Sequence, residues 1–162
     1  MSYQIQPIQP RDREAVGTLV RDRWGDERVI VHEEIFHTKD LPGLKAVAND
    51  DLLGFLHYQI RGDVCEILTL SSLRKRQGIG SALVQSVEGM ARNQGCRKLS
   101  VTTTNDNLVA LAFYQHLGFV LAGVGLGLVD KARKLKPAIP EIGEHNIPIH
   151  DEINLEKVLG AK

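Results

Sequence analysis

One junction constrains the fold of this chain more than any other feature: a glycine-containing loop, residues 75–81, between a strand-like and a helix-like run. Val64–Leu70 is rich in apolar and β-branched residues, as strands are, and the helix-like pattern opens at Ser81. Gly78 and Gly80 let the backbone take unusual dihedrals and approach a bulky ligand closely. Free amides at a helix start attract anions. The junction therefore predicts a loop that binds phosphate or diphosphate, with a purely structural turn as the alternative.

Two familiar phosphate loops are excluded by the residues around these glycines. The dinucleotide-binding fingerprint requires a small residue where this chain has Leu83. The nucleotide-triphosphate loop ends in Gly-Lys-Ser/Thr, whereas Gly80 is followed by Ser81 and Ala82. The loop therefore belongs to neither class.

A second segment downstream has the same strand–turn–helix order. Lys98–Thr103 reads as a β-branched strand, and Asn105–Asn107 carries turn and helix-cap chemistry. Leu108–Gln115 reads as a short amphipathic helix, and Gly118 is expected to end it.

The two segments together resemble motifs A and B of the GNAT superfamily of acetyl-CoA-dependent N-acetyltransferases. Motif A usually reads Arg/Gln-x-x-Gly-x-Gly/Ala, and residues 75–80 follow it except that Lys75 replaces the usual Arg or Gln. Motif B usually carries an Asn, an Ala, Phe-Tyr and Gly-Phe, which stand here as Asn107, Ala110, Phe113-Tyr114 and Gly118-Phe119. Motif A lies at about 64–95 and motif B at about 98–119, and the resemblance weakens toward both ends of the chain.

The resemblance implies an α/β (α+β) fold with a mixed, mostly antiparallel central sheet flanked by helices, and residues 1–162 as a single domain. The order of patterns agrees: a strand, two helices, three strands, a helix, a strand, a helix and two further strands. Val29–Phe36 is ambiguous between a strand and part of the second short helix. In the family, the strands preceding the two motifs run parallel and splay apart around the pantetheine arm.

The resemblance also implies a binding site for acetyl-CoA as a co-substrate, without a metal. Backbone amides of residues 76–81 would hold the diphosphate, the Leu70 amide would contact the acetyl carbonyl, and Asn107 would contact CoA or act only as a helix cap. The predicted cofactor-binding residues are Leu68, Leu70, Lys75, Arg76, Gln77, Gly78, Ile79, Gly80, Ser81, Asn107 and Tyr114.

Two side chains are candidates for proton transfer. Tyr114 is the predicted acid that protonates the leaving thiolate, because the family places a tyrosine near the CoA sulfur and a free phenol has a pKa of ~10. Glu66 is the predicted base, since desolvation in a half-buried strand would raise its pKa. Strand alternation places Glu66 on one side with Leu68 and Leu70. The alternative for Tyr114 is a packed aromatic without a catalytic role. The alternative for Glu66 is a surface carboxylate paired with Lys or Arg, with a water chain acting as the base.

Composition narrows the function classes. Twenty basic and twenty acidic side chains give zero formal charge, which argues against a general nucleic-acid or membrane-surface binder. No stretch resembles a signal peptide or a membrane span, and two cysteines make no disulfide framework, so we expect a cytoplasmic protein. His32 and His37 lack metal-ligand order and are assigned to the acceptor side. We expect a monomer or homodimer.

The predicted reaction is acetyl transfer from acetyl-CoA to a primary amine of a small molecule, peptide or protein. A catalytically silent acyl-CoA-binding regulatory module of the same fold is the alternative. The acceptor would be shaped by residues 24–43 and 130–151. The late segment, together with Glu152 just beyond it, carries both basic and acidic residues. It could select an anionic or a cationic acceptor, or form a dimer contact.

Overall fold

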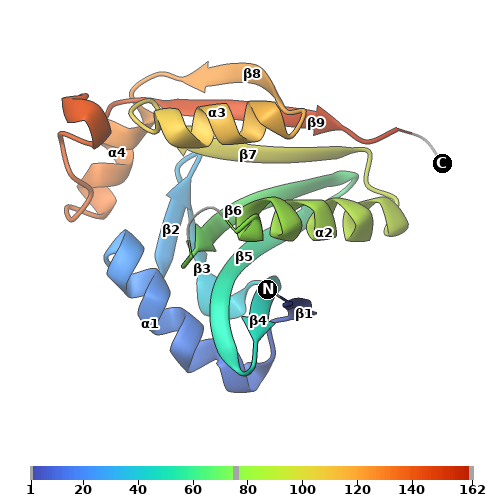
Figure 1. Cartoon of the computed structure of the whole chain (residues 1–162). Helices are drawn as coiled ribbons and strands as arrows, with labels where there is room; N and C mark the ends of the chain where they lie inside the picture. Colours follow the sequence, from blue (N-terminus) through green and yellow to red (C-terminus); the bar gives the residue numbers. More distant parts are fainter. Residues whose placement is uncertain (1, 75–76, 161–162) are drawn as a thin grey trace.

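The computed structural model describes residues 2–74 and 77–160. Its main sheet has seven strands in the order β1-β4-β5-β6-β7-β9-β8 (Figure 1). Every neighbouring pair is antiparallel except β6 and β7, which are parallel. The strands are β1 (Gln4–Pro7), β4 (Gly43–Ala48), β5 (Asp51–Arg61), β6 (Val64–Ser72), β7 (Lys98–Thr104), β8 (Val120–Gly125) and β9 (Glu152–Val158). The predicted mixed, mostly antiparallel sheet is confirmed.

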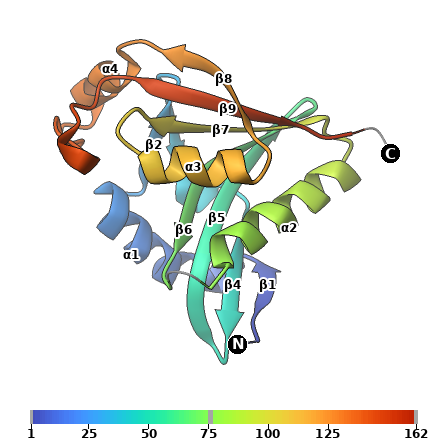
Figure 2. The same cartoon turned by 45° about the horizontal axis from the view of Figure 1, so that its top comes forward.

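Helices cover both faces of this sheet (Figure 2). They are α1 (Arg13–Trp24), α2 (Ile79–Asn93), α3 (Leu108–His116) and α4 (Leu128–Leu135). The apolar stripe of α2, which includes Leu83 and Val87, packs with α3 on one face and forms the main core with Leu56 and Leu99. On the other face, α1 packs against Phe55 of β5. None of the helices in the described part of the chain is long and apolar enough to cross a membrane.

The region between α1 and β4 contains a hairpin instead of the expected second helix. Strands β2 (Arg28–Val31) and β3 (Glu34–His37) pair antiparallel, and the turn residues His32 and Glu33 have φ of 52° and 65°. The strand alternative for this segment is therefore correct and the helix alternative is wrong. Strand periodicity prevails because Val29, Val31 and Phe36 bury their side chains together against Leu68 of β6.

Strand β6 contains an irregularity that changes which way its side chains face. Its pairing with β5 joins Thr69 to His57 and Ile67 to Tyr58, so Leu68 has no residue opposite it. Glu66 and Leu68 lie toward the β2–β3 hairpin, whereas Leu70 packs in the core formed with α2 and α3. The predicted placement of Leu70 on the same side as Glu66 is therefore wrong, because the bulge reverses the alternation.

Strands β6 and β7 separate beyond a short paired stretch. Their register runs only from Val64↔Lys98 to Ile67↔Val101, although both strands continue past it. Figure 1 shows β6 and β7 diverging toward α1, with β2 reaching into the opening. The parallel pair therefore leaves an opening between its carboxyl ends, as the resemblance to the GNAT superfamily implied.

Candidate functional site

The start of α2 is built to receive an anion. Gly78 is the N-cap, with φ of 71° and open space where a Cβ would stand, and among residues 2–74 and 77–160 no side chain caps this end. The first turn contains no acidic residue, and Gln77 and Gly78 are exposed. The helix begins at Ile79, slightly earlier than expected. The predicted contacts of Lys75 and Arg76 lie outside the described residues.

A cleft of about 290 Å³ lies between the diverging strands and the start of α3. We call it the inter-strand cleft; its lining includes Leu68, Leu70, Gly80, Asn107 and Tyr114. It therefore joins five of the predicted cofactor-binding residues in one space that also receives the start of α2. A wider hollow of about 680 Å³ lies beside β1 and β4, and none of the predicted site residues that the structure describes lines it.

Gly80 brings α2 and α3 close together at this cleft. A Cβ on residue 80 would lie 3.4 Å from Cζ of Phe113. Asn107 caps α3, because its Oδ1 accepts a hydrogen bond from the Ala110 amide at 3.1 Å. The expected cap is therefore present, and Asn107 also lines the cleft at the start of α3.

Tyr114 lies at the base of the cleft, 5 % exposed, with its ring between Phe113 and Phe119 at centroid distances of 5.0 and 5.3 Å. Burial raises the pKa of Tyr114 above that of a free phenol, while the charge of Arg23 opposes the shift. Tyr114 is therefore a weaker acid than the free phenol on which its predicted role was argued. No described residue forms a hydrogen bond with its hydroxyl, and no buried side-chain oxygen in the described residues lacks a partner, so this hydroxyl reaches the open cleft.

A second cavity of about 350 Å³ adjoins the inter-strand cleft. It lies between β2, the ends of β7 and β9, α4 and residues 138–140, and we call it the hairpin cavity. Both hollows are lined by Arg23, Trp24, Leu68, Thr102, Thr103 and Asn107. A molecule in the hairpin cavity therefore lies next to one in the cleft.

Glu66 is not among the described residues that line the inter-strand cleft or the hairpin cavity. Its side chain is 20 % exposed, and its Oε2 lies 3.7 Å from Nε2 of His32. Burial raises the pKa of Glu66, partly offset by His32 and Arg61. The predicted direction of the shift is confirmed, and His32 and Glu152 stand between this carboxylate and the hairpin cavity.

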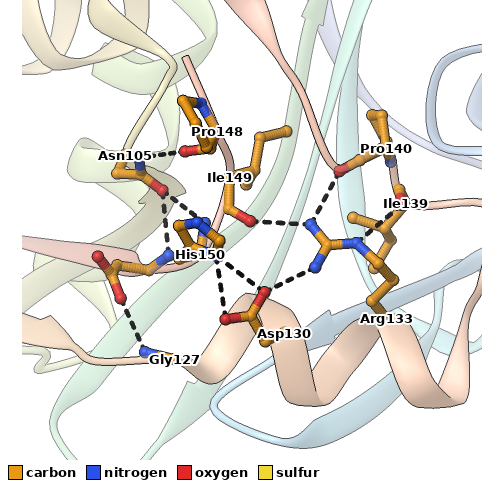
Figure 3. Close-up of polar contacts among 10 residues, drawn as sticks. Asn105, Gly127, Asp130, Arg133, Ile139, Pro140, Pro148, Ile149 and His150 are labelled. Carbon is orange, nitrogen blue, oxygen red and sulfur yellow. Dashed lines mark hydrogen bonds and ion pairs between the residues drawn. The ribbon is translucent and has the colours of Figure 1, made fainter.

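Arg133 of α4 ties the segment after α4 to the cavity wall. Its guanidinium donates to the carbonyls of Ile139 at 3.1 Å, Pro140 at 2.9 Å and Ile149 at 2.8 Å, and to Asp130 at 2.7 Å (Figure 3). One side chain thus donates hydrogen bonds to three backbone carbonyls of a segment without regular secondary structure. The basic charge expected in this segment therefore has a structural role at Arg133.

Asn105 joins the other side of the same segment to the end of β7. Its Oδ1 accepts from the amides of His150 and Asp151, and its Nδ2 donates to the Pro148 carbonyl at 2.9 Å (Figure 3). The Asp151 carboxylate in turn accepts from the Gly127 amide at 2.7 Å. The cavity wall is therefore held from two sides before any ligand binds.

Removing the Arg133 guanidinium should loosen this wall. We expect Arg133→Met, which keeps the apolar stem, to lower the free energy of unfolding by about 2 to 3 kcal/mol, because three carbonyls and Asp130 lose a charged donor. Chemical denaturation measures the change. Arg92→Met is the matched control: Arg92 pairs with Glu88 on the surface of α2, so its loss should cost less than about 1 kcal/mol. Equal effects of the two substitutions would contradict this role for Arg133.

The chain belongs to the GNAT acetyltransferase family, whose sequence pattern it matches over residues 5–119. YdhI of Bacillus subtilis strain 168, described as an uncharacterized protein, is 42 % identical over 137 residues, which are 84 % of this chain and 86 % of YdhI. An IAA acetyltransferase from Bacillus cereus ATCC 14579 has the same fold, with a TM-score of 0.77 at 23 % identity, over 98 % of this chain and 100 % of that one.

A solved GNAT acetyltransferase from Elizabethkingia anophelis, described with acetyl-CoA bound, is also similar. Its TM-score is 0.68 at 22 % identity, over 97 % of this chain and 98 % of that one. At this identity the likeness establishes the shared fold.

Two residues near the site were not singled out from the sequence. His32 was assigned only to the acceptor side, and Glu152 was one of several charges near the late segment. Their contact joins positions 120 residues apart, which no local pattern signals. The local signal for this turn is weak, because His32 and Glu33 are neither Asn nor Gly and the turn is followed directly by Glu34.

Proposed function

We propose that this protein is an N-acetyltransferase that moves the acetyl group of acetyl-CoA to a primary amine while both substrates are bound. One observation carries the proposal: the start of α2, which no side chain of the described residues caps, opens onto the inter-strand cleft, and that cleft adjoins a separate cavity. If the diphosphate binds at the α2 amides and the acetyl group lies near Tyr114, the hairpin cavity remains available for the amine.

Family membership supports the same assignment, and a protein of this fold is described with acetyl-CoA bound. Residues 77–81 would hold the diphosphate through their amides, and the free edge of β6 beyond Ile67 would contact the pantetheine arm. The Leu70 amide is the proposed donor to the thioester oxygen, where negative charge develops.

The reaction needs proton transfers at two atoms. The amine nitrogen forms a bond to the carbonyl carbon, the carbon–sulfur bond breaks, and the electron pair leaves with sulfur. Tyr114 gives its hydroxyl proton to that thiolate, because its raised pKa keeps it protonated at working pH. The nitrogen loses two protons; one replaces the proton of Tyr114, and the other passes by way of Glu66 to solvent.

Calorimetry and product release test the proposal together. Acetyl-CoA should bind the purified protein, and CoA should be released when primary amines are added. A protein that binds acetyl-CoA without turning over any of a broad amine panel would instead fit the silent binding module. Lack of acetyl-CoA binding would refute both assignments.

Glu66→Gln tests the base. Because the pKa of Glu66 is raised above its ordinary value of 4.5, the wild-type rate should fall as pH decreases through that raised pKa, where the carboxylate becomes protonated. The variant should be slower by tenfold or more and should lack this acid limb. The rate measured across pH with one amine shows both effects.

Glu156→Gln is the control for that experiment. Glu156 stands on β9 and pairs with Lys98, and in the described residues it lines neither hollow. Its substitution should leave the pH profile unchanged. A wild-type rate and profile in Glu66→Gln would remove Glu66 from the mechanism.

A further inference from the structure

His32 lies between two carboxylates from different strands. Its amide donates to Glu152 at 3.1 and 3.2 Å, and its ring Nδ1 lies 3.3 Å from Oε1 of the same residue. On the other side, its Nε2 lies 3.7 Å from Oε2 of Glu66. Glu152 has a side chain 5 % exposed and lines the hairpin cavity. Glu152 and His32 thus connect this cavity with Glu66.

Neighbouring hydrogen bonds determine where the ring of His32 carries its proton. The Thr102 hydroxyl donates to Oδ1 of Asn154 at 2.8 Å, so the Thr102 oxygen accepts from Nε2 of His32 at 3.1 Å. In the neutral ring the lone pair is then on Nδ1 and faces Glu152. Two acceptors at 3.3 Å leave a place for one proton between them.

The charges around this group are otherwise paired. Arg61 forms an ion pair with Glu34, next to Glu66, and Lys131 lies 3.6 Å from Glu33. In the cavity wall, the Lys136 ammonium donates to the Arg28 carbonyl at 2.9 Å and lies 3.7 Å from Asp26. Glu152 is therefore the carboxylate that the hairpin cavity presents to a ligand among the described residues.

Besides Glu152, the lining of the cavity combines polar residues, among them Arg23, whose guanidinium lies 5.2 Å from the Trp24 ring centroid, with an apolar wall. The apolar wall includes Val29, Val31, Leu68, Val129 and Ile149. Such a wall suits a hydrocarbon or aromatic group on the ligand.

We propose that the hairpin cavity binds a primary amine with an apolar body and no carboxylate beside the amine, that Glu152 holds its ammonium group, and that His32 passes the ammonium proton to Glu66. The inference rests on the proposed acetyl transfer and chooses the cationic class of acceptor.

The proton moves without any further reactant. The ammonium gives one proton to the place between Glu152 and Nδ1 of His32, which leaves a neutral amine with a free electron pair. As Nδ1 gains that proton, Nε2 releases its own toward Glu66, and Glu66 returns it to solvent. Burial raises the pKa of both Glu152 and Glu66, which makes each a stronger proton acceptor than a surface carboxylate.

A matched pair of probes tests the acceptor class. With saturating acetyl-CoA, 2-phenylethylamine should be acetylated with kcat/KM at least tenfold above that of phenylalanine, because the carboxylate of phenylalanine would stand beside Glu152. Glu152→Gln should reduce this ratio to less than threefold by weakening the first amine. A general loss of structure would lower both rates and leave the ratio unchanged.

His32→Asn tests the proton route without breaking the turn. Asparagine accepts the φ of 52° and keeps the amide that Glu152 binds. The variant's kcat for 2-phenylethylamine should fall at least tenfold, and its KM should stay within threefold of the wild-type value. Its rate should keep increasing with pH beyond the pH at which the wild-type rate levels off. Glu33→Asn, at the next turn position, should change none of these.

Each outcome separates this inference from the proposed function. Equal kcat/KM for the two probes, or a wild-type rate and pH profile in His32→Asn, would overturn the inference while leaving acetyl transfer intact. The inference would also be overturned if the protein bound acetyl-CoA but neither bound nor acetylated 2-phenylethylamine. Absence of acetyl-CoA binding would refute the proposed function itself.

Discussion

Tyr114→Phe is expected to lower kcat by about 100-fold or more and to leave the affinity for acetyl-CoA within about twofold. The ring would keep its place between Phe113 and Phe119, so the cleft should retain its shape. Only the hydroxyl that reaches the cleft is lost, and with it the proton for the departing thiolate. Steady-state kinetics gives kcat, and calorimetry gives the affinity.

Stability should not fall with this substitution, because no described residue forms a hydrogen bond with the Tyr114 hydroxyl. Tyr58→Phe is the matched control: Tyr58 is a half-buried phenol on β5 that lines neither the inter-strand cleft nor the hairpin cavity. It should keep kcat within about twofold. If Tyr114→Phe turns over at the wild-type rate, Tyr114 is only a packing residue.

Gly54→Ala should destabilise the protein by about 3 kcal/mol, the upper end of the usual cost of overpacking. A Cβ at Gly54 in β5 would lie 2.7 Å from the Ser71 carbonyl oxygen and 2.9 Å from Cγ2 of Ile79. The carbonyl belongs to the neighbouring strand of the sheet and cannot rotate away. Thermal unfolding should show a melting temperature lower by about 6 to 12 °C.

The same substitution should also weaken acetyl-CoA binding, because Ile79 is the first residue of α2 and would be pushed off the sheet. Gly89→Ala in the same helix is the control. Nothing lies within 4 Å of a Cβ at Gly89, so alanine there should raise stability by about 1 kcal/mol. A Gly54→Ala protein as stable as the wild type would show that α2 can shift freely.

Much of the fold follows from local chemistry. Gly78 relaxes the start of α2, Asn107 caps α3, and Gly118, with φ of 94°, follows its last turn. These signals act within one turn of chain, so the sequence indicates them directly. Strand β6 was predicted on the same kind of evidence, yet its bulge at Leu68 was not, because a bulge depends on the register with β5.

The sequence by itself determined the family, the order of most elements and the loop at the start of α2, because short-range patterns of glycine, caps and apolar spacing specify them. Only the tertiary structure decided that the β2–β3 turn places His32 between Glu66 and Glu152, and that Arg133 pins the opposite wall of the cavity. Those contacts join distant parts of the chain, and their existence depends on how strands and helices pack rather than on any local preference.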